Sequence, residues 1–151
     1  MKEINISKEI SNIEDVIIKE GFLVNTTVGY SMYPMIRQGR DTVLIRPCNG
    51  RLKKYDVVLY KVNGNYILHR IIKVIPDSYI IRGDNCINKE YGITDADILG
   101  VLTEFYRDNK QIKVDDFVYK LYVRMWNFIF PIRYCYKRAR GLASRIKRRI
   151  N

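Results

Sequence analysis

Short runs rich in valine, isoleucine and tyrosine fill most of this chain, and they constrain its fold more than any other feature. Residues of these types favour strands, and turn-forming residues separate the runs. Asn63-Gly64, between two of them, is a strong signal for a β-hairpin. Pro76-Asp77 and Asp108-Asn109 indicate further turns. We therefore predict a mainly β (α+β) fold with antiparallel strands over residues 22–28, 42–46, 55–62, 66–75, 78–82, 98–106 and 111–114.

Helical periodicity flanks this β-rich region on both sides. Isoleucines at positions 6, 10, 13 and 17 predict an amphipathic helix over residues 7–20, which Gly21 would end. A stripe of Phe117, Leu121, Met125 and Phe128 predicts a second helix that Pro131 breaks, and a further stripe begins at Ile132. We divide the chain into an N-terminal amphipathic helix (1–21), a β-rich domain (22–116) and a basic amphipathic helical tail (117–151).

Charge is distributed very unevenly between these parts. Residues 1–116 hold 17 Lys and Arg with all 16 Asp and Glu, whereas residues 117–151 hold 10 Lys and Arg and no acid. Such asymmetry indicates a polyanionic partner. Basic and apolar residues with Trp126 are typical of a helix in a membrane interface, so we expect an anionic membrane surface. The alternative is that the apolar stripe packs on the β domain. Nucleic acid is disfavoured because no nucleic-acid-binding motif is present.

The cysteines and the N-terminus bear on the compartment. Cys48, Cys86 and Cys135 are odd in number and form no CxxC pair, so neither a disulfide framework nor a zinc site is expected. Free thiols fit a reducing compartment. The sequence has no pattern of a signal peptide or a transmembrane span. We expect a cytoplasmic protein, peripheral on the inner membrane face, without metal or cofactor.

One histidine, His69, stands out among the residues that could do chemistry. It occupies a position in a strand where alternation with Ile67 and Ile71 predicts an apolar residue. Upstream, Ser31 lies in a loop between strands. A serine hydroxyl needs a neighbouring base to become nucleophilic, and an imidazole can exchange that proton near physiological pH. The sequence thus offers a nucleophile and a base.

Four short motifs around these residues resemble those of the signal peptidase I superfamily of serine peptidases, and they occur in that family's order between residues 26 and 104. Ser31-Met32-Tyr33-Pro34 matches its Ser-Met-x-Pro nucleophile box. Residues 54–60 resemble its Gly-Asp-(Val/Ile)-Val strand, with Tyr55 in place of glycine. Residues 68–72 resemble its Val-His-Arg-Val box, and residues 83–85 match its Gly-Asp-Asn box.

This resemblance implies a coiled antiparallel β domain like that of signal peptidases and self-cleaving repressors. Since histidine stands at the base position, the resemblance is to the Ser–His type of the endoplasmic reticulum and archaea. It implies Ser31 as nucleophile and His69 as base. The acid of this type lies beyond the Gly-Asp-Asn box, and both Asp84 and Glu90 remain candidates. Cys86 is interpreted as a bystander thiol and Arg70 as a structural ion-pair partner.

Three residues of the serine loop are expected to serve substrate binding. Backbone N–H groups around Ser31 would form part of an oxyanion hole, with Met32 in that segment. Gly29 would let the substrate backbone approach closely, and Pro34 would keep the loop short and rigid.

The resemblance departs from the family before the nucleophile box. Signal peptidases carry a transmembrane helix there, whereas this chain has the charged helix of residues 7–20. We therefore expect a serine endopeptidase that cleaves a peptide or protein substrate, such as a leader or signal segment, at the membrane surface. The alternative is a non-catalytic binding module that keeps the fold and binds a membrane or an acidic partner. A self-cleaving regulator is disfavoured, since no DNA-binding segment precedes the β domain.

Overall fold

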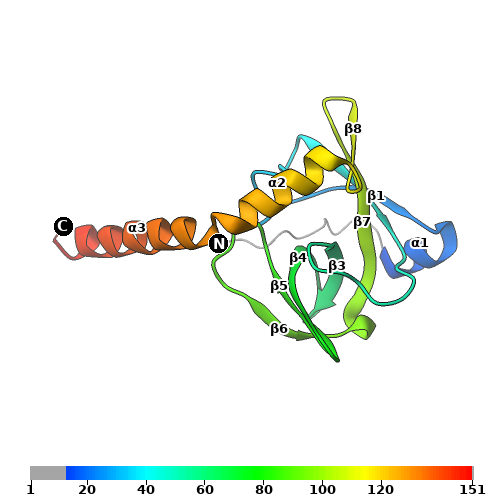
Figure 1. Ribbon diagram of the computed structural model, residues 1–151, viewed down its shortest axis with the longest axis horizontal. Helices are drawn as coiled ribbons and strands as arrows, with labels where there is room; N and C mark the ends of the chain where they lie inside the picture. Colours follow the sequence, from blue (N-terminus) through cyan, green and yellow to red (C-terminus); the bar gives the residue numbers. More distant parts are fainter. Residues whose placement is uncertain (1–12, 151) are drawn as a thin grey trace. The chain divides into compact units, whose positions relative to one another are not determined.

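The computed structural model describes residues 13–150, with side chains through residue 142. The chain divides into two compact units at Asp116/Phe117, the boundary at which the acidic residues end. Figure 1 follows the elements in chain order. They are α1 (Ile13–Glu20), β1 (Leu23–Thr26), β2 (Asp41–Arg46), β3 (Val57–Val62), β4 (Asn65–Ile75), β5 (Ser78–Arg82), β6 (Glu90–Ile93), η1 (Asp95–Asp97), β7 (Ile98–Arg107), β8 (Lys110–Lys113), α2 (Phe117–Phe128) and α3 (Phe130–Ile150).

The first unit is built on one eight-stranded antiparallel sheet. Its strand order is β1-β2-β7-β3-β4-β5-β6, and β8 pairs with β7. The long strand β7 pairs with both β2 and β3, so it joins the start of the chain to the central hairpin (Figure 1). The mainly β, α+β fold class predicted from the sequence is thereby confirmed.

All seven predicted strands are present, within a few residues of their predicted ends. The prediction missed β6, a four-residue strand that contains Gly92 at positive φ and pairs with β5. The N-terminal helix is present as α1. Its predicted first part, residues 7–12, lies outside the described residues. Gly21 ends α1 as expected, with a φ of 73° and its N–H donated to the Ile17 carbonyl at 3.1 Å.

The β3–β4 hairpin fixes which side chains share a face. Its two-residue turn, Asn63-Gly64, has both residues at positive φ, as a type I′ turn requires. Because Val62 pairs with Asn65, Val58 lies opposite His69 and Tyr60 opposite Ile67. Side chains alternate along a strand, so these four residues project from the same face of the hairpin. His69 therefore lies on a face whose other members form the hydrophobic core.

That core contains nine buried residues. They are Leu52, Val58, Tyr60, Ile67, Ile71, Tyr79, Ile81, Ile93 and Ile98. Its members come from β3, β4, β5, β6 and β7 and from the loop before β3, so burial of apolar area ties these strands to one another. His69 is only 2% exposed on this face. Burying an imidazole costs free energy unless both of its ring nitrogens have hydrogen-bond partners.

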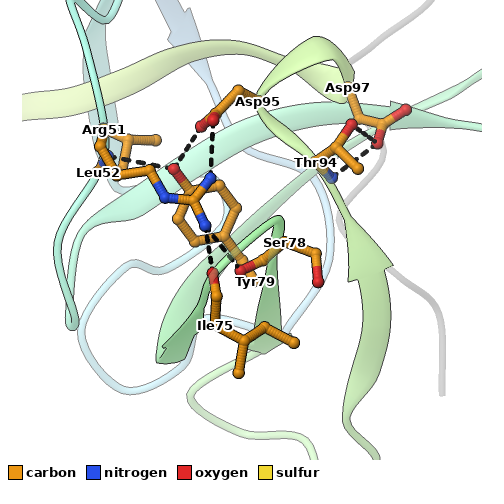
Figure 2. A network of polar contacts seen from close by, with 8 residues as sticks. All are labelled: Arg51, Leu52, Ile75, Ser78, Tyr79, Thr94, Asp95 and Asp97. Carbon is orange, nitrogen blue, oxygen red and sulfur yellow. Dashed lines mark hydrogen bonds and ion pairs between the residues drawn. The ribbon is translucent and has the colours of Figure 1, made fainter.

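A polar network joins the loop before β3 to the start of β5 and to η1 (Figure 2). The Arg51 guanidinium lies 4.2 Å from the centroid of the Tyr79 ring and donates to Asp95 at 2.7 Å and to the Ser78 carbonyl at 3.1 Å. The Tyr79 hydroxyl donates to Asp95 and accepts from the Leu52 N–H. Figure 2 also shows Thr94 and Asp97 capping η1. The network holds the loop before β3 against β5.

The second unit consists of two helices in the positions expected of the tail. The predicted break occurs at Ile129, and α3 begins at Phe130, so Pro131 lies in the first turn of α3. Proline is tolerated there because the first N–H groups of a helix have no intrahelical acceptor. Within residues 13–150, no helix is both long and apolar enough to cross a bilayer.

The hairpin turn generates a stability prediction. Gly64 has a φ of 79°, and nothing lies within 4 Å of a Cβ built there, so a substitution meets backbone strain without a clash. We expect Gly64→Ala to lower the free energy of unfolding by about 1–2 kcal/mol. Gly64→Asn should cost less, since asparagine tolerates this conformation. Chemical denaturation measures both. Equal losses for the two variants would contradict the assignment of the cost to backbone conformation.

Candidate catalytic site

Ser31 and His69 meet in the structure although 38 residues separate them. The Ser31 Oγ lies 2.9 Å from the His69 Nε2. Ser31 begins a turn in the loop between β1 and β2, and His69 lies in the middle of β4. Each residue is only 2% exposed. The pair predicted from the sequence is therefore brought into hydrogen-bond contact inside the β unit.

Glu90 completes a path of hydrogen bonds through the imidazole. Its Oε1 lies 2.7 Å from the His69 Nδ1. When Nδ1 carries the proton and donates it to Glu90, Nε2 is free to accept the Ser31 hydroxyl proton. A hydroxyl, an imidazole and a carboxylate in this order can activate a serine for nucleophilic attack.

The structure separates the two candidate acids that the sequence left open. Both Asp84 carboxylate oxygens accept from Arg70, Oδ1 from Nε at 2.8 Å and Oδ2 from Nη2 at 2.7 Å. The two side chains are 3% and 1% exposed, so this is a buried bidentate ion pair. Arg70 is thus the ion-pair partner that was predicted. Glu90 is the carboxylate bonded to the histidine.

The turn that contains Asp84 also holds the serine loop. The Asn85 N–H donates to the Ser31 carbonyl at 2.7 Å, and the Asn85 side-chain amide donates to the Tyr30 carbonyl at 3.1 Å. A Cβ on Gly83 would lie within 3 Å of both the Ser31 carbonyl oxygen and the His69 Nε2. Glycine is therefore required for the turn to approach the serine and histidine this closely.

Tyr60 is the member of the site that sequence reasoning missed. Its hydroxyl donates to the Glu90 Oε2 at 2.5 Å and lies 3.1 Å from the His69 Nδ1. Tyr60 is fully buried, so its hydroxyl fixes the second oxygen of Glu90 from inside the core. The hairpin register contained a signal for it: with Val62 opposite Asn65, Tyr60 falls on the same face as His69, two residues along.

Cys86 was interpreted as a bystander, and the structure places it against the imidazole. Its Sγ would lie 2.8 Å from a Cβ built on Gly83, and the His69 Nε2 would lie 2.9 Å from the same point. Its backbone N–H closes the turn by donating to the Gly83 carbonyl at 2.9 Å. The thiol therefore belongs to the immediate surroundings of His69, as its place next to the Gly83–Asn85 turn suggested.

The three expected substrate-binding residues of the serine loop have different environments. Gly29 is buried with a φ of 103°, and its N–H donates to the Gln38 side chain at 2.7 Å. Met32 is fully buried, backbone included, so it presents no surface to a substrate in this structure. Pro34 follows a cis peptide bond after Tyr33 and is half-buried.

The electrostatics of the site couple Glu90 to His69. Burial raises the pKa of the Glu90 carboxyl, but hydrogen bonds from His69 and Tyr60 outweigh it, so that pKa lies below its ordinary value. Burial lowers the pKa of His69, yet the hydrogen bonds to Cys86 and Glu90 outweigh it and raise the pKa of His69 to about 9. Glu90 is thus held ionised beside an imidazole that keeps its proton strongly.

The described part of the chain contains no cluster of three or more His, Cys, Asp or Glu side chains arranged to hold a metal ion. No protein-family model, curated protein or solved structure matches this chain.

The Arg70–Asp84 pair predicts a large loss of stability when one partner is removed. Asp84→Leu leaves a buried guanidinium without its counter-charge, and we expect the free energy of unfolding to fall by about 3–5 kcal/mol. The double variant Arg70→Met/Asp84→Leu should recover most of that loss, since no buried charge remains.

Chemical denaturation tests this, with the partly exposed Lys61–Glu14 pair as the control. Glu14→Leu should cost about 1 kcal/mol or less, as surface ion pairs do. A cost for Asp84→Leu no larger than that for Glu14→Leu would refute the structural role of the buried pair.

The single histidine allows a direct measurement of the coupling to Glu90. We expect the imidazole NMR signals to titrate with a pKa of about 9 in the wild type and at a lower pH in Glu90→Gln. Since the pKa of His69 is raised on folding, its contribution to stability is complete below about pH 6.5 and is lost as the pH rises through 9.

Asp77→Asn is the matched control, because it removes one carboxylate from an exposed turn outside the site. The coupling would be disproved by a Glu90→Gln titration midpoint that coincides with that of Asp77→Asn.

Proposed function

We propose that this protein is a serine endopeptidase in which Ser31 is the nucleophile, His69 the general base and Glu90 the acid that orients the base. One observation carries the proposal. The Ser31 Oγ, the two His69 nitrogens and the Glu90 carboxylate form a continuous hydrogen-bond path with distances of 2.9 and 2.7 Å. The resemblance of the four motifs to the signal peptidase superfamily supports the same assignment.

In the proposed reaction, Ser31 Oγ attacks the carbonyl carbon of the scissile peptide bond while His69 Nε2 takes the hydroxyl proton. His69 then gives that proton to the leaving amine, and the C–N bond breaks to leave an ester on Ser31. Water, deprotonated by His69, hydrolyses the ester and restores the hydroxyl. Glu90 remains ionised throughout and stabilises the imidazolium.

Two neighbours refine this chemistry. The Tyr60 hydroxyl donates to Glu90 Oε2, while Oε1 is bonded to the His69 Nδ1. With both oxygens held, the carboxylate cannot rotate away from Nδ1. Backbone N–H groups of the turn that begins at Ser31 are proposed to bind the developing oxyanion, where a buried environment strengthens each hydrogen bond. Gly29 would allow the substrate backbone to approach that turn.

The surface beside the site fits a peptide substrate. Tyr30 and Tyr33, on either side of the Ser31-Met32 dipeptide, are exposed, as is Tyr91 next to Glu90. Exposed tyrosine rings offer apolar contact area with little entropy to lose, so they suit an extended peptide or leader segment. All three cysteines are free thiols, which supports placing the proposed enzyme in the cytoplasm, peripheral on the inner membrane face.

One observation favours the alternative of a non-catalytic binding module. At 2% exposure, Ser31 is nearly closed to solvent. An endopeptidase must admit a peptide carbonyl to this hydroxyl, whereas a binding module need not. The two functions therefore differ in whether the Ser31 hydroxyl reacts with an acylating reagent.

Covalent labelling tests the proposal. We expect a fluorophosphonate probe, or a penem acylator in parallel, to label the wild type at one site, and Ser31→Ala and His69→Ala to lose the label. Ser78→Ala is the matched serine control, because Ser78 lies in β5 outside the site, and it should label like the wild type. A folded wild type that reacts with neither reagent, also with lipid present, would favour the binding module.

The pH dependence of labelling is a second check on the same variants. Only neutral His69 can accept the Ser31 proton, so the labelling rate should rise with pH and level off above about 9. Glu90→Gln should move the midpoint to lower pH while reducing the plateau rate by roughly 10²–10⁴-fold. A wild-type rate that does not change with pH would exclude His69 as the base.

A further inference from the structure

Every charged residue of the second unit is a lysine or an arginine. Its described side chains include the exposed Lys120, Arg124 and Arg140 and the half-buried Lys137, and the sequence from residue 117 onward contains no acid. A solvated surface helix ordinarily mixes both signs of charge, because opposite charges three or four residues apart stabilise it. Residues 117–151 contain no acid, so this stabilisation cannot arise within the described helices, and their formal charge is wholly positive.

A stripe of large apolar side chains runs along the same two helices. The spacing of its members is four, four, three, four and four residues, which keeps them on one helical face. All six are exposed, Phe128 at 85% and Ile132 at 73%. The stripe consists of Phe117, Leu121, Met125, Phe128, Ile132 and Tyr136.

Backbone hydrogen bonds keep the stripe continuous across the junction between α2 and α3. The Ile129 N–H donates to the Met125 carbonyl at 3.0 Å, and the Arg133 N–H donates to the Ile129 carbonyl at 3.2 Å. Both bonds have the four-residue spacing of an α-helix. The helical periodicity of α2 therefore continues through Ile129 into α3, and the apolar side chains of both helices lie on one face.

Aromatic and guanidinium groups lie beside this stripe. The Arg133 guanidinium carbon lies 3.5 Å from the centroid of the Trp126 ring, and Tyr122 stacks on Trp126 at 6.0 Å. Tryptophan and tyrosine favour the headgroup level of a bilayer, where one end of the ring is apolar and the other is wet. Arginine beside them supplies the charge that attracts phosphate.

We propose that residues 117–142 bind the surface of an anionic lipid bilayer, lying in the interface with the stripe toward the acyl chains and the cations at the phosphates. The cations require a negatively charged surface. The apolar stripe requires that this surface also offer an apolar phase. A nucleic acid would use the cations, but it offers no apolar phase to Phe117, Phe128 and Ile132. A bilayer interface accommodates both groups at once.

This proposal stands apart from the proposed peptidase. It depends on residues of the second unit alone, and the chemistry at Ser31 depends on residues of the first. If both hold, the peptidase acts on peptides that are themselves at a membrane surface. Ser31→Ala distinguishes the two, because it should abolish covalent labelling while binding vesicles like the wild type.

Trp126, the single tryptophan of the chain, reports directly on this surface. The full-length protein is titrated with vesicles of phosphatidylcholine alone and of phosphatidylcholine with phosphatidylglycerol at 3:1, and vesicle flotation measures binding independently. We expect binding and a blue shift of the tryptophan emission only with the anionic vesicles. Binding should weaken as salt rises.

Two double variants separate the contributions. Phe128→Ser/Ile132→Ser should weaken binding at least tenfold, since it removes apolar area that the interface would bury. Arg124→Gln/Lys137→Gln should weaken it by about fivefold per residue at low salt. The matched controls in the first unit, Ile18→Ser/Phe22→Ser and Lys53→Gln/Lys73→Gln, remove exposed side chains of the same kinds and should bind like the wild type.

Three outcomes would overturn the proposal. They are failure of the wild type to bind anionic vesicles, unchanged binding by Phe128→Ser/Ile132→Ser, and loss of binding in the controls equal to that in the stripe variants. A labelled DNA duplex and a single-stranded RNA are run beside the vesicles. Tight binding to either, without vesicle binding, would assign the cations to a nucleic acid instead.

Discussion

The buried ion pair between Arg70 and Asp84 is the contact on which the arrangement of the site depends. Arg70 follows His69 directly in β4, and neighbouring residues of a strand point to opposite faces. One strand therefore presents the imidazole on one side and the anchor for the Gly83–Asn85 turn on the other. That turn in turn holds the carbonyl of Ser31. The distance between the hydroxyl and the imidazole is thus set by a charge pair that touches neither.

The Glu90 carboxylate orients His69, but it also keeps the imidazole protonated at neutral pH, where a general base would have to be neutral. Glu90 fixes the proton on Nδ1, which leaves Nε2 free for Ser31, but it also stabilises the charged imidazole and raises the pKa of His69. The Tyr60 hydroxyl binds the other oxygen of Glu90 and lies 3.1 Å from Nδ1, so it also helps to hold the imidazole. Without Glu90, the imidazole would be neutral at lower pH and would keep only Tyr60 as a neighbour of Nδ1. In the proposed mechanism, the orientation of His69 and the pH at which it can act as a base are therefore coupled through one carboxylate.

The strands could be predicted because their residue types and turns agree with each other. Asn63-Gly64 gave both the hairpin and, through its register, the face on which His69 lies. Tyr55 illustrates the limit of such patterns. It replaces the glycine of the motif it resembles, and the structure gives it a φ of 83°, a conformation that favours glycine. The backbone at this position thus has a conformation that suits glycine although the sequence places a tyrosine there.

The choice between Asp84 and Glu90 could not be made from sequence for a physical reason. Both follow β5 within eight residues, and either can reach a histidine if the intervening chain turns suitably. The decision rests on β6, whose four residues include a glycine and give almost no periodic signal. Pairing of Ile81 with Glu90 brings that carboxylate back beside the core. The Asn63-Gly64 turn did place Tyr60 on the face of His69, but its bond to Glu90 again depends on β6.

The charge of the second unit has a structural cost that bears on its use. Arg133 and Lys137 are four residues apart, and Lys137 and Arg140 are three apart, so like charges are neighbours on the helix surface. Such pairs destabilise an isolated helix, and residues 117–151 contain no acid that could offset them within these helices. An anionic surface would reverse the sign of that term, because each cation then gains a counter-charge. The helices would therefore be more stable on such a surface than in water, and binding and helix formation would reinforce each other.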